Sequence, residues 1–498
     1  MRLEHSLPDS VPSVGDLRIA VRHGRDALAG LSAVALELGG LTLGQRWAHR
    51  RGGRPRSAAL LLGTLRGAVY PFPMRCWVLA GGFLLGCGAR TPLSDRDAPA
   101  APRDEGRGAT GSGQGAGASG ADDGPVVGGL KPDAQWAKEG RNAGNTALAG
   151  SKSVAQGKLR WSALLGHDVS PTTPVIDADG TVYVGCSQGL CAYGPDGKKR
   201  WASGQEPCAY GSPAIAASGK IFANCGAVDP DTHTLLWSVR SKGLGWVRGP
   251  VTIGARGTVY LHTELPDLAQ GVKVGGKLTA FSQGGKQLWQ VGTAGAMGAM
   301  AVGADDTLYH TSFSWGVTDG LRALTPDGAT KWEFDAGERL GTPIVMPDGS
   351  LVVPGEARLF ALSADGEEKW SVAAPTTQSW QMPCGALGPD GTIYVGGHGV
   401  LHVVTPGGEL LWSKVVSFPD DFSCPLVDGN GNIHVAPDAA ELSVFSPTGE
   451  LLWWLPFGDT SIPHYTASPA LAADGTLYVT SMAAPGQDLT TMLYAIGP

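Results

Sequence analysis

A phrase that ends in tryptophan recurs along the last three quarters of the chain, and this repeat constrains the fold more than any other feature. Its clearest copy spans residues 400–412, V-L-H-V-V-T-P-G-G-E-L-L-W, where a β-rich stretch leads into a glycine turn and a Trp strand. The phrase closes at eight positions, 40, 36, 52, 43, 38, 42 and 41 residues apart: Trp161, Trp201, Trp237, Trp289, Trp332, Trp370, Trp412 and Trp453. A period near forty with all-β patterning is the signature of a β-propeller.

Each period predicts one four-stranded blade. The first strand follows a Ser/Thr-Pro pair such as Thr173-Pro174, and a D-G turn leads to an alternating strand such as G-T-V-Y-V-G at 180–185. A third strand of the L-x-A-L type follows, and the fourth ends in Trp. The D-G and P-D-G turns are short hairpin signals where φ must be positive. The 75 glycines and 35 prolines fit many short strands joined by tight turns.

The two ends of the repeat region predict how the ring closes. The last period, ending at residues 492–498, has no Trp strand, and the fragment G-K-L-R-W at 157–161 is a Trp strand with nothing before it. Joined, they complete an eighth blade and remove the free sheet edges of an open ring. We therefore expect an all-β, eight-bladed β-propeller of four-stranded blades over residues 131–498, with seven blades as the alternative.

A candidate export signal lies at residues 74–87, M-R-C-W-V-L-A-G-G-F-L-L-G-C. A basic residue, an apolar core and a small residue before Cys87 are the anatomy of a secretory signal. Its ending, L-L-G-C, resembles the lipobox of bacterial lipoproteins, which implies that Cys87 receives a lipid. We expect a lipoprotein signal peptide over 74–86, while an apolar run that happens to contain Cys is the alternative.

Composition separates the remaining N-terminal parts. Residues 1–87 hold eleven Arg, no Lys and five acidic residues, which gives a net charge of +6. Because the whole chain has a net charge of −7, the remaining residues have a net charge of −13. We expect residues 1–73 to be an over-extended gene start or disordered, with translation beginning at Met74. Residues 87–130 are rich in Gly, Ala and Ser, which predicts a flexible tether after the lipidated Cys. The acidic body argues against nucleic-acid binding, which needs basic surface.

Cysteines indicate the compartment. Six remain after Cys76 and Cys87 are set aside, and an even number fits export to an oxidising space. The spacing predicts three disulfides, with buried free thiols as the alternative: Cys186–Cys191, Cys208–Cys225 and Cys384–Cys424.

The A-L-x-P-D-G-x-x-x-W phrase and the G-T-V-Y-V strand resemble the PQQ-like, or quinoprotein-type, repeat over about residues 131–498. Together with the lipobox, the chain also resembles the propeller lipoprotein of the outer-membrane β-barrel assembly machinery. The resemblance implies that the eight Trp side chains dock between neighbouring blades and are structural.

The resemblance also raises a cofactor, PQQ with calcium. The dehydrogenases of this family carry a vicinal Cys–Cys pair beside PQQ and hold calcium with Glu and Asn, and this chain has no Cys-Cys pair. The acidic pieces at 177–180 and 428–432 fall where hairpin turns are expected. We expect no cofactor, no metal site and no catalytic residue, with PQQ and calcium as the alternative.

Binding residues concentrate on loops held by a rigid scaffold. In four-stranded blades, the loops after each Trp and those between the second and third strands share one face, which we call the loop face. The candidates for binding there are eleven residues, each of which could instead pack over its own blade: His167, Asp168, Tyr210, Trp246, Arg248, Trp380, Gln381, Asp421, Phe422, His464 and Tyr465.

These features predict a lipid-anchored protein of the cell envelope, on its periplasmic or outer-membrane side. We expect a non-catalytic, monomeric propeller that acts as a binding scaffold for another envelope protein and touches the membrane through its anchor. One alternative is a PQQ-dependent quinoprotein dehydrogenase. Another is a propeller that binds a saccharide at an aromatic mouth formed by Trp246, Trp380 and Tyr465.

Overall fold

The computed structural model describes part of the chain, in two compact units divided between Gln114 and Gly115. The described residues are 18–23, 31–38, 41–48, 61–65, 74–78, 129–204, 211–239, 246–247, 249–266, 273–293, 300–314, 317–373, 384–397, 399–416, 423–437, 440–459, 464–483 and 489–498. Strands and turns account for this part of the chain, and none of its residues forms a helix that could span a membrane.

The N-terminal unit contains a three-stranded antiparallel sheet and a separate two-stranded one. Their strands are β1 (Arg18–His23), β2 (Leu31–Leu38) and β3 (Leu41–Ala48), then β4 (Leu61–Leu65) and β5 (Met74–Val78). The strand β5 covers the beginning of the predicted signal peptide.

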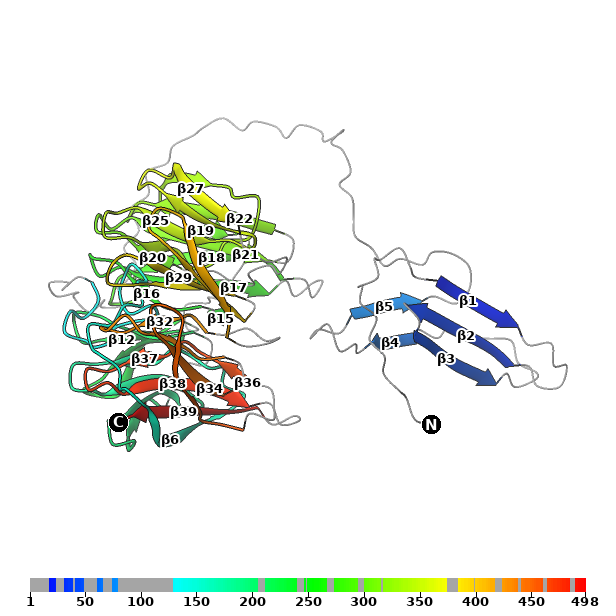
Figure 1. Cartoon of the computed structure of the whole chain (residues 1–498), viewed down its shortest axis with the longest axis horizontal. Helices are drawn as coiled ribbons and strands as arrows, with labels where there is room; N and C mark the ends of the chain where they lie inside the picture. Colours follow the sequence, from blue (N-terminus) through cyan, green and yellow to red (C-terminus); the bar gives the residue numbers. More distant parts are fainter. Residues whose placement is uncertain are drawn as a thin grey trace, which may run out of the picture. The chain divides into compact units, whose positions relative to one another are not determined.

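The C-terminal unit is an eight-bladed β-propeller, as the repeat predicts (Figure 1). The first four blades are built from β7 (Val175–Ile176), β8 (Val182–Cys186), β9 (Gly189–Tyr193) and β10 (Lys199–Ala202); β11 (Ala214–Ile215), β12 (Ile221–Ala223), β13 (Gly226–Asp229) and β14 (Thr234–Ser238); β15 (Trp246–Val247), β16 (Thr252–Ile253), β17 (Val259–Pro266), β18 (Lys273–Phe281) and β19 (Gln287–Thr293); β20 (Met300–Val302), β21 (Leu308–Ser314), β22 (Val317–Leu324) and β23 (Thr330–Phe334).

The second half of the ring repeats this plan. Its blades are built from β24 (Ile344–Val345), β25 (Leu351–Pro354), β26 (Arg358–Leu362) and β27 (Glu368–Ala373); β28 (Cys384–Leu387), β29 (Ile393–Gly397), β30 (Val400–Val404) and β31 (Leu410–Val415); β32 (Leu426–Val427), β33 (Ile433–Val435), β34 (Glu441–Phe445) and β35 (Leu451–Pro456); β36 (His464–Thr466), β37 (Ala470–Leu471), β38 (Leu477–Ala483), β39 (Thr490–Gly497) and β6 (Lys158–His167).

The ring closes where the two ends of the repeat region meet. Strand β39, the last of the chain, pairs antiparallel with β6, and the register places Ala495 opposite Trp161. Figure 1 shows the two strands side by side beside the C-terminus. The eighth blade is therefore shared between the start and the end of the propeller sequence, and the seven-blade alternative is wrong.

The repeated Trp joins each blade to the next. Its ring lies on the glycine turn between the third and fourth strands of the following blade, and its indole nitrogen donates to a backbone oxygen in that turn. Six such bonds have N···O distances of 2.7–3.2 Å: Trp161 to Pro195, Trp237 to Gln283, Trp289 to Pro326, Trp332 to Ala364, Trp370 to Pro406 and Trp412 to Pro447. A Cβ added to Gly197, whose φ is +80°, would lie 2.7 Å from the Trp161 ring, so this turn needs glycine for conformation and for space.

Two joints differ from this pattern in an informative way. Trp201 stacks on His233, with ring centroids 4.9 Å apart, because the next turn carries His233 at a φ of +61° in place of glycine. Trp453 lies against Gly157, where an added Cβ would be 2.7 Å from the ring. Gly157 immediately precedes β6, so the joint is preserved even where the chain is interrupted between its two ends.

The first strands of neighbouring blades contact one another, as β16 with β20, β20 with β24 and β28 with β32, and therefore line the axis of the ring. Residues 129–153, here called the channel segment, run along these strands. On entry the segment forms isolated bridges to the first two blades, Trp136 with Ile176 and Lys138 with Ala214. The side chain of Trp136 is 1% exposed. This segment carries no copy of the repeat, so the repeat pattern does not predict its position.

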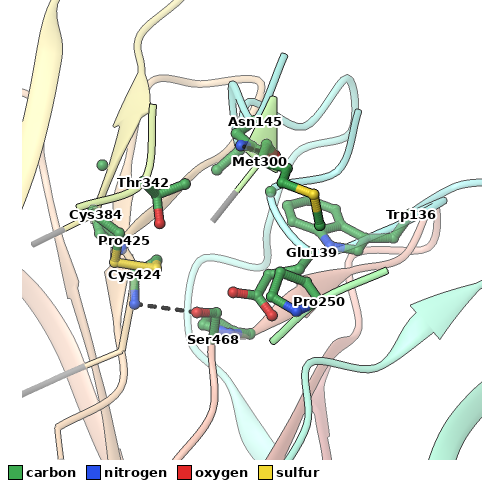
Figure 2. Close-up of a pocket in the computed structure, with 14 residues that line it drawn as sticks. Trp136, Glu139, Asn145, Pro250, Met300, Thr342, Cys384, Cys424, Pro425 and Ser468 are labelled. Atoms are coloured by element: carbon green, nitrogen blue, oxygen red, sulfur yellow. Dashed lines mark hydrogen bonds between the residues drawn. A yellow bond between two sulfur atoms is a disulfide. The ribbon is translucent and has the colours of Figure 1, made fainter. Parts of the chain in front are cut away.

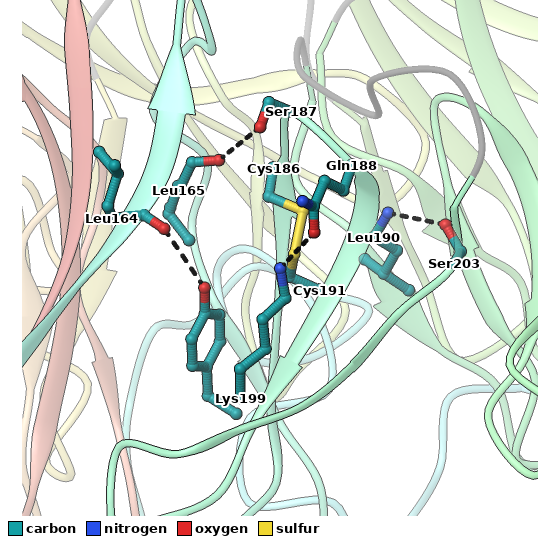
Figure 3. The surroundings of a disulfide bond; sticks show 10 residues. Leu164, Leu165, Cys186, Ser187, Gln188, Leu190, Cys191, Lys199 and Ser203 are labelled. Atoms are coloured by element: carbon teal, nitrogen blue, oxygen red, sulfur yellow. Dashed lines mark hydrogen bonds between the residues drawn. A yellow bond between two sulfur atoms is a disulfide. The ribbon is translucent and has the colours of Figure 1, made fainter.

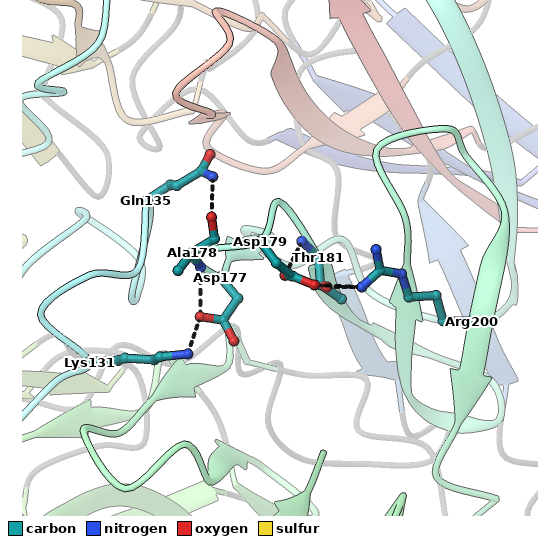
Figure 4. Close-up of polar contacts among 7 residues, drawn as sticks. All are labelled: Lys131, Gln135, Asp177, Ala178, Asp179, Thr181 and Arg200. Atoms are coloured by element: carbon teal, nitrogen blue, oxygen red, sulfur yellow. Dashed lines mark hydrogen bonds and ion pairs between the residues drawn. The ribbon is translucent and has the colours of Figure 1, made fainter. Parts of the chain in front are cut away.

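Side chains fix the start of the channel segment to the turns of two blades, and Figure 4 shows its contacts with the turn of the first blade. The Lys131 ammonium lies 2.6 Å from the carboxylate of Asp177. The Gln135 amide donates to the Ala178 carbonyl at 3.0 Å and accepts from the Ala473 amide at 2.7 Å. The channel segment therefore enters at the face that carries the short D-G turns.

The segment then reverses and runs back along the opposite side of the axis. Four amides from the first strands of the fourth to seventh blades donate to its carbonyls at 2.8–3.0 Å: Val302 to Ala143, Val345 to Gly144, Leu387 to Thr146 and Val427 to Ala147. Arg141, Asn145 and Ala147 have positive φ values of 69°, 58° and 46°. Such strained backbone persists only where the surrounding structure holds it. The channel segment therefore fills the axis and contacts most of the ring.

Candidate functional site

The channel ends at the loop face in a shallow depression, which we call the mouth depression. It has a volume of about 250 Å³. A second cavity of about 20 Å³, room for roughly one water molecule, lies within the channel against Trp136 and Asn145. Figure 2 shows the inner cavity, with Glu139 and Trp136 on one side and Cys384 and Cys424 on the other. The polar side chains that line the mouth depression are Glu139, Thr173, Ser212, Ser423, Thr466 and Ser468.

Glu139 lies where the channel segment reaches the loop face. Its Oε2 accepts a hydrogen bond from Ser212 Oγ at 2.5 Å. The Thr173 amide in turn donates to Ser212 Oγ at 2.9 Å, so the hydroxyl proton of Ser212 is directed at the carboxylate. Two Ser/Thr-Pro motifs from the first and second blades thereby position one carboxylate at the mouth. Glu139 is the only charged side chain in the described lining.

The opposite wall comes from the sixth to eighth blades. The disulfide Cys384–Cys424 joins the first strand of the sixth blade to the start of the seventh. The Cys424 amide donates to Ser468 Oγ at 3.1 Å. Ser423 beside it is 9% exposed, and its Oγ has no hydrogen-bond partner among the described residues. A buried hydroxyl without a partner costs free energy unless a ligand satisfies it.

Lys138, the residue before Glu139 in the channel segment, is fully buried. Its side chain is 0% exposed, and its Nζ donates to the Glu139 carbonyl and to Asn145 Oδ1. The Asn145 amide donates onward to the carbonyls of Met300 at 2.9 Å and Pro343 at 3.0 Å. Burial lowers the pKa of Lys138 from 10.5 to about 8, because the interior disfavours its charged form. This network ties the channel segment to the fourth and fifth blades.

A pH titration of stability tests the burial of Lys138. Between pH 8 and 10.5 the unfolded state binds a proton that the folded state has released, so stability rises with pH in this window. Relative to a Lys138→Met variant, the wild type is expected to gain about 3 kcal/mol in free energy of unfolding from pH 7 to 10.5. Denaturant titrations of both proteins measure the difference. A difference that stays constant with pH would mean that Lys138 is solvated.

Among the described residues, two of the three predicted disulfides are formed. Cys186–Cys191 closes the loop between β8 and β9, beside the bond from Ser187 Oγ to the Leu165 carbonyl (Figure 3). Cys384–Cys424 spans two blades. Cys225 is disulfide-bonded, and Cys208, its predicted partner, lies outside the described residues.

Loop length predicts which disulfide contributes more to stability. The cysteines of the inter-blade bridge are 40 residues apart, against 5 for Cys186–Cys191. Replacing Cys384 and Cys424 by Ala is expected to cost about 4 kcal/mol, against about 2 kcal/mol for the Cys186/Cys191 pair. Thermal unfolding of the two double variants measures this order, and the reverse order would contradict the loop-closure explanation.

The described candidates of the loop face take separate positions. His464 is buried within the eighth blade, where its Nδ1 lies 3.0 Å from Ser481 Oγ and its Nε2 donates to the Asp459 carbonyl. Burial lowers the pKa of His464. His167 and Asp168 are exposed at the end of β6. Tyr465, 54% exposed, adjoins Thr466 of the mouth depression in sequence.

Most other candidates cannot be placed. Trp246 lies on β15 in the third blade, and its side chain is not described. The remaining six lie outside the described residues: Tyr210, Arg248, Trp380, Gln381, Asp421 and Phe422. The sequence prediction missed Glu139 and the hydroxyl residues of the mouth depression. The Ser/Thr-Pro pairs at 173–174, 212–213, 342–343 and 468–469 were the available signal, because each immediately precedes a first strand that lines the axis.

The two acidic pieces form hairpin turns, as expected. Asp179 accepts from Thr181 and Arg200, and these bonds lower its pKa to about 2 (Figure 4). Asp428 is fully buried and accepts from His434, which lies 3.3 Å away, and from Ser153 of the channel segment. These partners hold its pKa well below the usual range. Within the described residues, no three His, Cys, Asp or Glu side chains converge as metal ligands.

The fold is an eight-bladed β-propeller, and its repeated phrase resembles the PQQ-like type. The family model described as "PQQ_2: Outer membrane protein assembly factor BamB" matches residues 274–431, which confirms the resemblance seen in the repeated phrase. None of the curated proteins compared with the chain matches it.

Solved structures share the propeller at low sequence identity. Quinohemoprotein alcohol dehydrogenase from Comamonas testosteroni has a TM-score of 0.56 and 15% identity over 73% of this chain and 81% of its own. The enzyme ADHIIG from Pseudomonas putida HK5 has a TM-score of 0.55 and 16% identity over 73% and 80%. BamB from Moraxella catarrhalis has a TM-score of 0.46 and 16% identity over 68% and 99%. The likeness to the two dehydrogenases agrees with the propeller fold and leaves the activity open.

The residues present do not fit PQQ in the channel. The channel segment leaves a cavity of about 20 Å³ there, far below the roughly 300–1,000 Å³ of sites for cofactor-sized ligands. The mouth depression is larger, but its described lining carries one negative charge, from Glu139, and no positive charge. A carboxylate-bearing quinone would meet electrostatic repulsion there.

Proposed function

We propose that this protein is a non-catalytic binding scaffold of the cell envelope, whose propeller presents its loop face to a partner protein. One observation carries the proposal, namely that the chain fills its own channel with residues 129–153. A propeller with a filled channel offers its outer loops and its mouth for binding. Loops on a rigid scaffold are the usual place for recognition.

Cysteine chemistry and the candidate signal sequence support the proposed compartment. Two disulfides join described residues, and Cys225 takes part in another, which is typical of proteins that mature in oxidising spaces. The motif L-L-G-C ending at Cys87 supports attachment to a membrane by a lipid. We therefore propose a lipidated Cys87 and a tether over residues 88–128, followed by the propeller.

The assembly-factor description of the matching family model supports a protein as the partner. The family model covers residues 274–431, about a third of the chain. We therefore do not transfer the identity of any partner from that family to this protein. A saccharide remains the competing ligand class, because the loop face carries the aromatic candidates Trp246, Trp380 and Tyr465.

Co-purification of the native lipoprotein from detergent-solubilised envelope tests the proposal. We expect a stoichiometric protein partner that is lost when the segments at residues 240–245 and 374–383 are shortened. The control is Lys198→Ala, because Lys198 is an exposed residue of the turn after Gly197, on the opposite face, and its loss leaves the contact of Gly197 with Trp161 in place. A Cys87→Ser variant is expected to leave the membrane fraction.

Reconstitution separates the enzymatic alternative. The protein is incubated with PQQ and calcium, and dye-linked alcohol oxidation is measured. Turnover by the reconstituted protein would overturn the scaffold proposal. Retention of the partner after both loops are shortened would contradict the assignment of the loop face.

A further inference from the structure

We propose that the mouth depression binds one lysine side chain of the partner protein, with its ammonium on Glu139 and Ser423. This inference rests on the proposed function and names the chemistry of its contact. The two groups stand on opposite walls, since Glu139 belongs to the channel segment and Ser423 to the seventh blade. Neither residue has a role in the blade repeat itself.

Charge complementarity favours a cation. Glu139 is the only charged side chain in the described lining, and it is fixed toward the mouth by Ser212. The neighbouring cation, Lys138, directs its ammonium to a backbone carbonyl and to Asn145, not to the Glu139 carboxylate. The negative charge at the mouth therefore has no ion-pair partner among the described residues. A carboxylate in a partly enclosed site attracts a positive group from a partner.

The unsatisfied hydroxyl of Ser423 provides independent support. Ser423 Oγ is buried in a residue that is 9% exposed, and it has no partner among the described residues. A native structure keeps few such atoms, and each one calls for an explanation such as a ligand. An ammonium is a donor with three N–H groups, so it can bond to the carboxylate and to separate hydroxyl oxygens at once.

Size and geometry select lysine among the possible occupants. The volume of about 250 Å³ is below the roughly 300–1,000 Å³ of sites for larger ligands, which favours a single side chain over a saccharide. Arginine binds best when its planar fork meets both carboxylate oxygens. Ser212 already bonds to Oε2 of Glu139, so a fork would compete with it. The compact ammonium of lysine needs only the other oxygen.

Zero-length cross-linking of the native complex tests the contact. A carbodiimide joins a carboxylate directly to an amine that touches it, so the co-purified complex should yield a Glu139 peptide linked to a lysine of the partner. The Glu139→Gln variant keeps an oxygen for Ser212 but loses the charge. It is expected to lose the cross-link and to bind the partner about ten- to a hundred-fold more weakly.

The Asp133→Asn variant is the matched control. Asp133 is an exposed acid in the same channel segment, outside the lining of the mouth depression, and its loss should leave affinity and cross-link unchanged. A partner that co-purifies and binds the Glu139→Gln variant with full affinity would overturn the lysine site and leave the proposed function standing. Absence of any protein partner would overturn both.

Discussion

Replacing residues 129–153 by a Gly/Ser linker of equal length is expected to abolish cooperative folding of the propeller. The segment supplies hydrogen bonds to the first strands of most blades and buries Trp136 at the axis. Loss of one such tryptophan costs about 3–5 kcal/mol. The remaining bonds bring the total to the scale of a domain's whole stability, about 5–15 kcal/mol.

Far-UV circular dichroism and denaturant unfolding measure this effect. The matched control replaces the Gly/Ala-rich residues 100–124 in the same way and should unfold like the wild type. A linker variant of residues 129–153 that keeps the wild-type midpoint would show that the ring is stable with an open channel. An open channel would then be a possible site for a ligand.

Replacing Trp453 by alanine is expected to cost about 3–5 kcal/mol, while the same change at Trp454 should cost no more than about 0.5 kcal/mol. The two residues are neighbours on β35 with opposite environments. Trp453 is 8% exposed and lies on Gly157 at the closing joint of the ring, whereas Trp454 is 56% exposed. Comparing the two variants therefore separates the effect of losing the blade joint from the effect of removing a tryptophan from β35.

Chemical unfolding of the two single variants provides the measurement. Trp161→Ala serves as a second joint variant, since its indole donates to the Pro195 carbonyl of the next blade. It should resemble Trp453→Ala. Equal costs at Trp453 and Trp454 would contradict the docking of the repeat Trp on the following blade.

The repeat made most of the fold predictable from sequence. Each copy carries its own strands, turn and Trp, so local patterns determine blade number and the joining of β6 to β39. The turn glycines follow the same logic, since Gly197 is required by φ and by contact with Trp161. Information that is local in sequence and repeated eight times is read with little ambiguity.

The mouth depression was not predictable by the same route. Glu139 reaches it on a segment that has no repeat pattern, and its position depends on contacts with blades far away in sequence. Ser212 and Ser423 appear in the sequence only as residues that begin strands or precede Cys-Pro. Their convergence is a consequence of ring closure, which places the starts of all first strands around one axis.

His464 shows the opposite error, in which a residue predicted to bind a partner proves to be bonded within its own blade. His464 looks functional in sequence because it stands beside Tyr465 in a long loop. In the structure its two ring nitrogens bond to Ser481 and to the Asp459 carbonyl inside the eighth blade. Such local satisfaction of a polar side chain has no signature in the sequence.

Native-state hydrogen exchange of the intact protein tests the filled channel most directly. The amides of Trp136 and Ala149 donate to the carbonyls of Ile176 and Val427 within the ring. They should exchange as slowly as amides of the blade strands, because both would require opening of the ring. Exchange at the rate of an unstructured peptide would contradict a channel filled by its own chain.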